Sequence, residues 1–132
     1  MLYSGTITRC RNMKFIFSHA GAGVPLLSAR ISGLVRRDKR LAERIPDGPM
    51  AELKRLYYDT ALSARPELLA PLLHLVTPAN ILFGTDTPWG SMTVADTVAG
   101  LAKHGFSPAE LRRIERDNAL AIMLSLAGKY SI

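Results

Sequence analysis

Residues 80–86 read Asn-Ile-Leu-Phe-Gly-Thr-Asp, an apolar run that ends in a glycine and polar residues. Two other stretches have the same character, residues 14–19 (Lys-Phe-Ile-Phe-Ser-His) and residues 55–60 (Arg-Leu-Tyr-Tyr-Asp-Thr). Short runs rich in β-branched and aromatic residues that stop at a polar turn predict strands. Helical patterns separate the three runs, and strands that alternate with helices predict βαβ units with a parallel sheet. The sequence therefore predicts an α/β fold.

A first helix is predicted after Pro25. Apolar residues follow the proline at helical spacing on one stripe, and arginines lie on another. The apolar stripe consists of Leu27, Ile31, Leu34, Val35, Leu41 and Ile45, and the basic one of Arg36, Arg40 and Arg44. This pattern predicts one helix that packs its apolar face and exposes its basic face. A second helix is expected to begin at Pro66, with Pro71 kinking or splitting it.

Two further helices have capping-box starts. Residues 93–96 (Thr-Val-Ala-Asp) and 107–110 (Ser-Pro-Ala-Glu) each place a hydroxyl three residues before a carboxylate. In that arrangement each side chain satisfies a free backbone amide at the start of a helix. The first of these helices is expected to stop at Gly105 and the second to run towards Asp117. A final helix is predicted from Asn118 to about Gly128.

The bulk composition narrows the class of protein. A chain of 132 residues with 48% hydrophobic residues has enough apolar material for one domain, residues 1–132. The lone Cys10 excludes a framework of internal disulfides, which favours a reducing, cytoplasmic setting. The longest apolar stretch, residues 119–127, is shorter than the roughly 18 residues of a membrane span. The net charge of +6 permits an acidic partner, but the basic helix face has no accompanying nucleic-acid motif, so no nucleic acid is expected.

Candidate functional residues stand where the predicted strands end, namely His19, Asp59 and Asp86. In parallel α/β folds the ligand site gathers at the carboxyl ends of the strands. Imidazole and carboxylate groups are ligands for zinc and similar ions, so the three residues form a candidate metal or acid–base cluster. The alternative is structural, with a hydrogen-bonded histidine and aspartates that cap turns. Trp89, in the loop after Asp86, either walls a pocket or covers the end of the fold.

Four motifs in this order resemble the amidohydrolase-related family. They are residues 17–21 (Phe-Ser-His-Ala-Gly) with Pro25 and Arg30, residues 58–60 (Tyr-Asp-Thr), residues 83–86 (Phe-Gly-Thr-Asp) with Pro88 and Trp89, and Asn118-Ala119. The chain is most similar to the branch of aminocarboxymuconate semialdehyde decarboxylase and its hydrolase relatives. The resemblance implies a (β/α)8 TIM barrel with one divalent metal, usually zinc. The three predicted strands would then be the sixth, seventh and eighth of the barrel.

The resemblance also implies roles for individual residues. His19 matches a histidine that acts as general acid/base on metal-activated water and lies at the metal. Asp86 matches a catalytic aspartate that is a metal ligand and can also take or relay a proton. Arg30 matches an arginine that reaches a substrate carboxylate across a dimer interface, with a solvated helix arginine as the alternative, and Trp89 is a candidate substrate-binding residue. For Asp59 a structural role is expected.

The chain also departs from the family pattern. Ala22 and Thr87 stand where many relatives have a glycine and an aromatic residue. The family's His-x-His pair and its fifth-strand histidine are absent, since the other two histidines, His74 and His104, lie in predicted helices. A catalytic zinc normally has three protein ligands, so the ligand set is incomplete.

A barrel of this kind needs about 250 residues, roughly twice this chain. The sequence therefore predicts the C-terminal part of a metal-dependent hydrolase or decarboxylase that acts on a small carboxylated substrate and is inactive by itself. Its expected partner is a second copy of the chain or the missing N-terminal part of the barrel. The alternative function is a self-associating or partner-binding part-barrel module without catalysis.

Overall fold

The computed structural model describes residues 1–123. Three short strands, β1 (Ile16–Phe17), β2 (Tyr57–Asp59) and β3 (Ile81–Leu82), form one parallel sheet in the order β1-β2-β3. Ile16 stands opposite Tyr57, and Tyr58 stands opposite Ile81. The α/β class, the three strands and their parallel pairing are confirmed. Each strand is shorter than the apolar run that predicted it.

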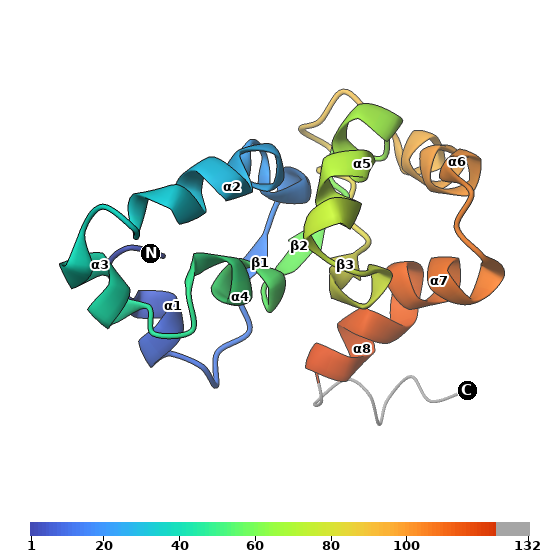
Figure 1. The fold of residues 1–132 in the computed structure, drawn as a ribbon. Coiled ribbons are helices and arrows are strands. Elements are labelled where there is room, and N and C mark those ends of the chain that lie inside the picture. The colour runs from blue at the N-terminus through green and yellow to red at the C-terminus, as the bar shows by residue number, and fades with distance from the viewer. Residues whose placement is uncertain (124–132) are drawn as a thin grey trace.

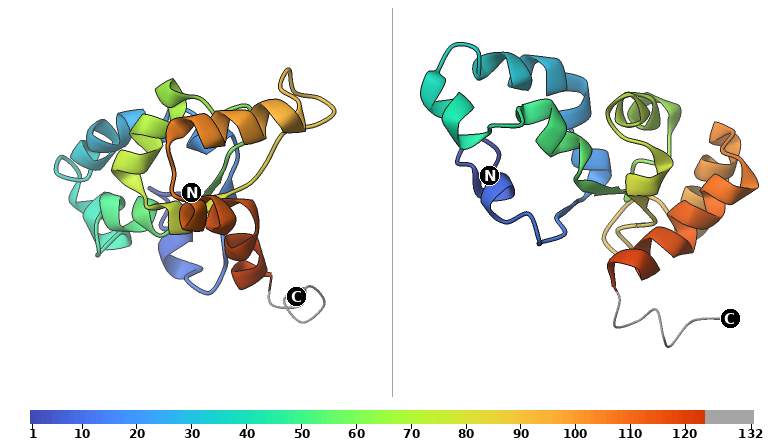
Figure 2. Two further views of the ribbon diagram at one scale, coloured as in Figure 1. Left: turned by 90° about the vertical axis from the view of Figure 1, so that its right-hand side faces the viewer. Right: turned by 60° about the horizontal axis from the view of Figure 1, so that its bottom comes forward.

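Helices connect and flank the strands. In Figure 1, α1 to α4 lie on one side of the strands and α5 to α8 on the other, and the right-hand view of Figure 2 shows the same arrangement. The helices are α1 (Thr6–Arg9), α2 (Val24–Leu34), α3 (Lys39–Arg44), α4 (Pro49–Lys54), α5 (Pro66–Leu75), α6 (Val94–His104), α7 (Pro108–Arg112) and α8 (Asn118–Ile122). No helix of the described chain has the length and apolarity that a membrane span requires.

The prediction of one long helix from Pro25 to Ile45 is wrong. The chain leaves the helix after Leu34 and starts α3 anew, with the Asp38 side chain accepting a hydrogen bond from Arg40 N at 2.9 Å as an N-cap. The expected apolar face is only partly buried, because Leu27 and Leu34 are 46% and 45% exposed. The short helix α4, which the sequence patterns did not predict, follows.

The later helices agree better with their predictions. Helix α5 begins at Pro66 and is continuous through Pro71, so the predicted split does not occur. Both capping boxes are present, and Gly105 ends α6 in the left-handed conformation with φ +92°. Hydrogen bonds from Thr93 lower the pKa of Asp96, and hydrogen bonds from Ser107 lower the pKa of Glu110. These hydrogen bonds are the ones expected of functioning caps.

The last two helices are more irregular than predicted. Helix α7 ends at Arg112, and a π-helical segment, Arg113–Asp117, connects it to α8. The predicted continuation of the final helix past residue 123 lies outside the described residues.

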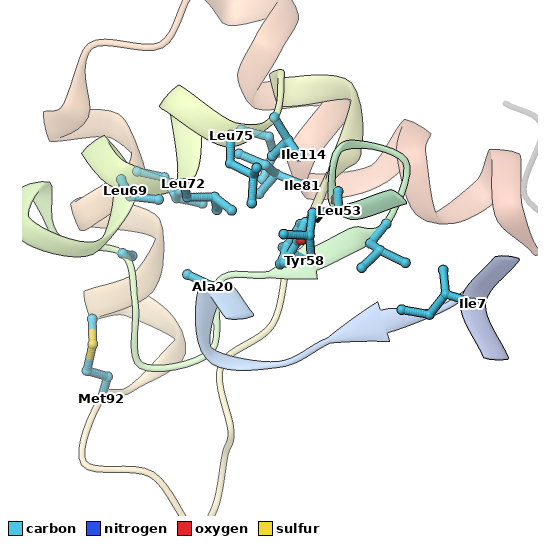
Figure 3. Close-up of a cluster of buried hydrophobic side chains, with 14 residues drawn as sticks. Ile7, Ala20, Leu53, Tyr58, Leu69, Leu72, Leu75, Ile81, Met92 and Ile114 are labelled. Atoms are coloured by element: carbon cyan, nitrogen blue, oxygen red, sulfur yellow. Dashed lines mark hydrogen bonds between the residues drawn. The ribbon is translucent and has the colours of Figure 1, made fainter. Parts of the chain in front are cut away.

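The hydrophobic core includes the central strand, β2, and side chains from the helices around it. Tyr58 is fully buried, donates a hydrogen bond from its hydroxyl to Leu53 O at 3.0 Å, and has a pKa raised by burial. Side chains from helices on both sides of the strands surround it (Figure 3). The cluster includes Ile7, Ala20, Leu53, Leu56, Ala64, Leu69, Leu72, Leu75, Val76, Ile81, Met92, Leu101 and Ile114. Burial of this apolar surface is the main favourable term in folding.

The two edges of the sheet differ. Leu82 O accepts from the N–H of Thr60, the residue that follows β2, so the backbone polar groups of Ile81 and Phe83 face away from β2. Asn118 Nδ2 donates to Ile81 O at 2.8 Å, and Phe83 N donates to Ile114 O at 2.9 Å. The outer edge of β3 is therefore capped by the segment between α7 and α8. Strand β1 has a neighbour on one side only among the described residues. Three parallel strands alone would leave two unpaired edges, and residues 1–123 leave one.

We expect Asn118→Ala to destabilise the chain by about 1–3 kcal/mol. The substitution removes the amide that donates to both Pro78 O and Ile81 O at 2.8 Å, and it leaves these carbonyls without that partner. Urea unfolding followed by circular dichroism measures the change. Asn12→Ala, at an exposed asparagine, is the matched control and should unfold like wild type. An Asn118→Ala midpoint equal to that of wild type would contradict the capping role.

Candidate functional site

The polar residues predicted to share one edge follow neighbouring parallel strands. His19 begins the turn after β1, Asp59 is the last residue of β2, and Asp86 lies in the loop after β3. Their strands all point the same way, so the three residues leave the sheet at the same edge. His19 and Asp86 come from strands that have β2 between them, which separates the two strand axes by roughly 10 Å.

His19 and Asp59 are in direct contact. The Asp59 carboxylate accepts two backbone hydrogen bonds on its Oδ1 atom, from His19 N at 2.9 Å and from Ala61 N at 3.0 Å. The His19 ring in turn meets the backbone of β2, because Nδ1 lies 3.2 Å from Ala61 O. The three residues thus form a closed set of hydrogen bonds between the end of β1 and the end of β2. The structural role expected for Asp59 is confirmed.

This arrangement selects one form of the neutral His19 ring. A backbone carbonyl can only accept, so the hydrogen bond to Ala61 O requires the proton on Nδ1. In the neutral ring Nε2 then carries the lone pair, which can take up a proton or bind a metal. The half-buried His19 side chain keeps part of its surface accessible.

A second set of hydrogen bonds connects β2 to the loop after β3. The buried Thr60 hydroxyl donates to Gly84 O at 2.9 Å and accepts from Gly84 N at 3.0 Å. Gly84 also lies against Asp59, because a Cβ atom at position 84 would stand 3.2 Å from both Cβ and Cγ of Asp59. Glycine therefore permits the close approach between the two strand ends.

Asp86 occupies a tight turn beyond this connection. Its backbone has φ +62°, and its carbonyl accepts from Gly90 N at 2.7 Å. Gly90 leaves room for the loop after β2, because a Cβ there would come within 2.6 Å of Leu62 Cδ2. The exposed Asp86 carboxylate has no hydrogen-bond or ion-pair partner within residues 1–123. It is therefore available to a ligand.

Backbone strain concentrates at this edge of the sheet. In the described chain, five residues other than glycine have positive φ, and all lie in loops that follow the three strands. Such a conformation costs about 1–3 kcal/mol for each residue and persists where surrounding contacts enforce it. The five are His19, Ala20, Ala22, Leu62 and Asp86. Strain of this kind is common at ligand sites, which supports a functional reading of this edge.

The two predicted substrate-binding residues form no hydrogen bond or ion pair with this cluster in the described chain. Arg30 lies on the exposed side of α2, about 9 Å along the helix axis from its start, and has no partner among the described residues. Trp89 is 89% exposed and lies in the loop that carries Asp86. The roles of both residues stay predictions.

A divalent metal would find an incomplete set of donors. His19 Nε2 and the Asp86 carboxylate suit such an ion in chemistry, but residues 1–123 contain no group of three histidine, cysteine or acidic side chains that could hold one. The described residues therefore do not form a complete metal site by themselves. His74 is exposed on α5, and the His104 ring packs on Phe106 with ring centroids 4.6 Å apart. Both agree with the prediction of surface and packing roles.

The family of the chain is established by comparison with known proteins. Residues 1–123 match the family model described as Amidohydrolase, and the chain belongs to this family. The family resemblance expected from the sequence motifs is confirmed.

Curated proteins that are similar to the chain in sequence are named as decarboxylases. The chain is 29% identical over 110 residues to "Decarboxylase macB" of Penicillium terrestre, a match that covers 81% of this chain and 32% of that protein. It is 31% identical over 88 residues to the 6-methylsalicylic acid decarboxylase of Penicillium expansum, covering 67% of this chain and 27% of that protein. The chain thus spans about a third of the length of these curated relatives.

A solved structure confirms the fold over nearly the whole chain. The dihydroxybenzoic acid decarboxylase of Polaromonas sp. JS666, solved with bound manganese and the inhibitor 2-nitroresorcinol, matches with a TM-score of 0.74 and 20% identity. The match covers 96% of this chain and 38% of that protein. The metal named for that protein is manganese, whereas zinc was expected from the sequence motifs.

Three parts of the site were not predicted from the sequence. These are the Ala61 carbonyl, the Thr60 hydroxyl and the close approach of Gly84. The sequence could not indicate a role for the Ala61 carbonyl, because every residue has a backbone carbonyl. Thr60 and Gly84 stand beside the predicted strand ends, and the register of β2 against β3 is what brings them together.

Thr60→Val should destabilise the chain by about 1–3 kcal/mol, because the isosteric side chain leaves the Gly84 N–H and C=O without the hydroxyl. We also expect faster amide hydrogen exchange at Gly84. Thr8→Val is the matched control, since the buried Thr8 hydroxyl has no hydrogen-bond partner in the described part of the chain. That substitution should be neutral or stabilising. Equal losses of stability in both variants would contradict a specific role for Thr60.

Proposed function

We propose that the chain is the C-terminal part of a metal-dependent decarboxylase with a (β/α)8 barrel, acting on a small carboxylated aromatic substrate. The observation that carries this proposal is the His19 ring, tied through Nδ1 to Ala61 O and so left with Nε2 free at the carboxyl edge of the sheet. Relatives named as decarboxylases support the reaction class. In the proposal His19 is the general acid/base and Asp86 is a metal ligand.

Loss of CO2 from an aromatic carboxylate requires one proton transfer. The ring carbon that bears the carboxylate gains a proton, the bond to the carboxyl carbon breaks, and its electron pair returns to the ring as CO2 leaves. Protonated His19 would donate that proton from Nε2 while Nδ1 keeps its hydrogen bond to Ala61 O. The neutral ring would then recover a proton from water. Because Nδ1 stays bonded to Ala61 O, Nε2 is the ring nitrogen that would give up and regain the proton.

The divalent metal belongs to the proposal for the whole protein. When bound, such an ion polarises oxygen atoms of the substrate and of water. In this chain Asp86 offers an exposed carboxylate that has no partner within residues 1–123. His19 Nε2 could bind the ion or carry a proton, but not both at once, and the proposed proton transfer requires it to carry the proton. The remaining ligands are proposed to come from the part of the barrel that precedes these three strands. Manganese and zinc are both candidates for the ion.

Arg30 and Trp89 are proposed to act on the substrate in an assembly. Arg30 is exposed and unpaired in the described chain, which leaves its guanidinium free to pair with a carboxylate held by a neighbouring copy. Trp89 would cover bound substrate from the loop after Asp86. Both proposals need a second surface that the described residues do not supply.

The isolated chain should not turn over substrate, because its metal ligands are incomplete. The assay measures CO2 release from 6-methylsalicylic acid with manganese or zinc added. Activity in the isolated chain, lost in both His19→Ala and Asp86→Ala, would overturn this expectation.

A chimera should recover the activity. In it, this chain replaces the matching part of the Penicillium expansum enzyme. We expect metal-dependent CO2 release that falls by about 10²–10⁴-fold in His19→Asn, as for loss of a general acid. His74→Asn, at an exposed histidine, is the matched control and should retain activity. A folded, metal-loaded chimera whose rate is unaffected by His19→Asn would refute the role of His19.

A second candidate function, association without catalysis, is favoured by the open edge of β1. Ile16 on β1 is 43% exposed, and Leu26 and Leu27 on α2, the helix that follows β1 in the chain, are also exposed. A cavity of about 300 Å³ with apolar walls, including Phe17 and Tyr58, lies beside the same strand. Open edges and contiguous apolar surface are places where other chains pair.

Sedimentation tests this association. At tens of micromolar we expect a dimer or larger species, and Ile16→Lys should shift it towards monomer because a charged edge residue opposes strand pairing. Val98→Lys is matched in exposure, at 43% on α6, and should leave the distribution unchanged. A stable wild-type monomer at these concentrations would count against self-association.

A further inference from the structure

We propose that Asp59 is a positioning residue, whose carboxylate holds the backbone of His19 and the carbonyl of Ala61 so that the His19 ring keeps its proton on Nδ1 and leaves Nε2 free. The importance of this role for catalysis rests on the proposed function of His19. The hydrogen-bonded arrangement itself does not rest on that function, because every contact in it lies within the described chain.

The first step is the backbone of His19. It has φ +56°, a conformation that side-chain-bearing residues avoid, and it is followed by Ala20 at φ +53°. The His19 N–H donates to Asp59 Oδ1 at 2.9 Å, a charge-assisted hydrogen bond from one strand end to the next. This contact fixes the direction in which His19 leaves β1. Without an acceptor at position 59, the strained turn loses a contact that maintains it.

The second step is the partner of the ring. The same Oδ1 atom accepts from Ala61 N at 3.0 Å, which holds the backbone at position 61. The carbonyl of Ala61 then meets His19 Nδ1 at 3.2 Å. The Ser63 hydroxyl also donates to Ala61 O at 2.9 Å, so the carbonyl is held from two sides. Asp59 Oδ1 thus positions both the backbone of His19 and the backbone at Ala61, whose carbonyl determines the His19 tautomer.

The third step is what confines Asp59 itself. Gly84 lies against it so closely that a Cβ would stand 3.2 Å from the Asp59 Cβ and Cγ atoms. Gly84 is held by both of its hydrogen bonds to Thr60, the neighbour of Asp59 on β2. The loop that carries Asp86 therefore buttresses the residue that orients His19. The two proposed catalytic residues are connected through Asp59.

The tautomer of His19 is the test, measured on the whole 132-residue chain labelled with ¹⁵N. Long-range ¹H–¹⁵N correlations at about pH 9, where free imidazole side chains are neutral, distinguish a protonated Nδ1 from a protonated Nε2. We expect wild-type His19 to carry its proton on Nδ1. Asp59→Asn keeps an oxygen acceptor and should keep this signature, whereas Asp59→Leu should give a mixture of both tautomers.

Two controls make the result specific. Thr8→Val, at a hydroxyl that has no hydrogen-bond partner among the described residues, lies outside this set of contacts and should leave the His19 tautomer unchanged. His74, exposed on α5, gives a reference signal that should be the same in every variant. A pure Nδ1–H signature in folded Asp59→Leu, or a protonated Nε2 in wild type, would overturn the proposal.

If Asp59→Leu does not fold, a hydrogen-exchange measurement on the wild-type chain tests the positioning role of Asp59. The His19 amide should exchange its hydrogen more slowly than the amide of the exposed Trp89, because only the former is bonded to a carboxylate. Equal exchange rates would overturn the proposal. The chimera assay is independent of both readouts, so a missing decarboxylase activity together with the expected tautomers would refute the proposed function and leave the positioning role intact.

Discussion

Strand β2 pairs in parallel with β1 on one side and with β3 on the other. Parallel pairing requires a helical crossover after each strand, and it brings the three carboxyl ends to one edge. His19, Asp59 and Asp86 share that edge for this reason, although up to 67 positions separate them in the sequence. Tyr58 on the same strand is fully buried, and core side chains from helices on both sides of the strands pack around it.

The strand ends are then connected to each other by short polar contacts. Asp59 binds the backbone of His19, and Thr60 binds the backbone of Gly84. These contacts use charge-assisted or buried hydrogen bonds, which are costly to break. They explain how the loops maintain a cluster of residues with positive φ at the edge where a ligand is proposed to bind. The same edge is incomplete as a metal site within residues 1–123, and β1 has a free side. Both features agree with a chain that spans about a third of its curated relatives.

Local sequence patterns predicted most of the elements. The two capping boxes place the starts of α6 and α7, because the chemistry of a cap is complete within four residues. The prediction of one helix from Pro25 to Ile45 was wrong because it rested on a local pattern alone, the spacing of the apolar residues. These apolar residues stay in phase across residues 35–38, so periodicity could not reveal the interruption, although Asp38 is a good N-cap residue. The cap on the outer edge of β3 was also missed, because it depends on Asn118, 37 residues after Ile81.

The sequence by itself determined the α/β class, the three strands, the family, and the residues at the strand ends. These follow from alternation of apolar runs and from motifs that are local in the chain. Only the tertiary structure decided how those residues are used. It joined His19 to Asp59 and Ala61 by hydrogen bonds. The physical reason is register: the offset of one strand against the next sets which backbone amides and carbonyls meet, and no single stretch of sequence contains that offset.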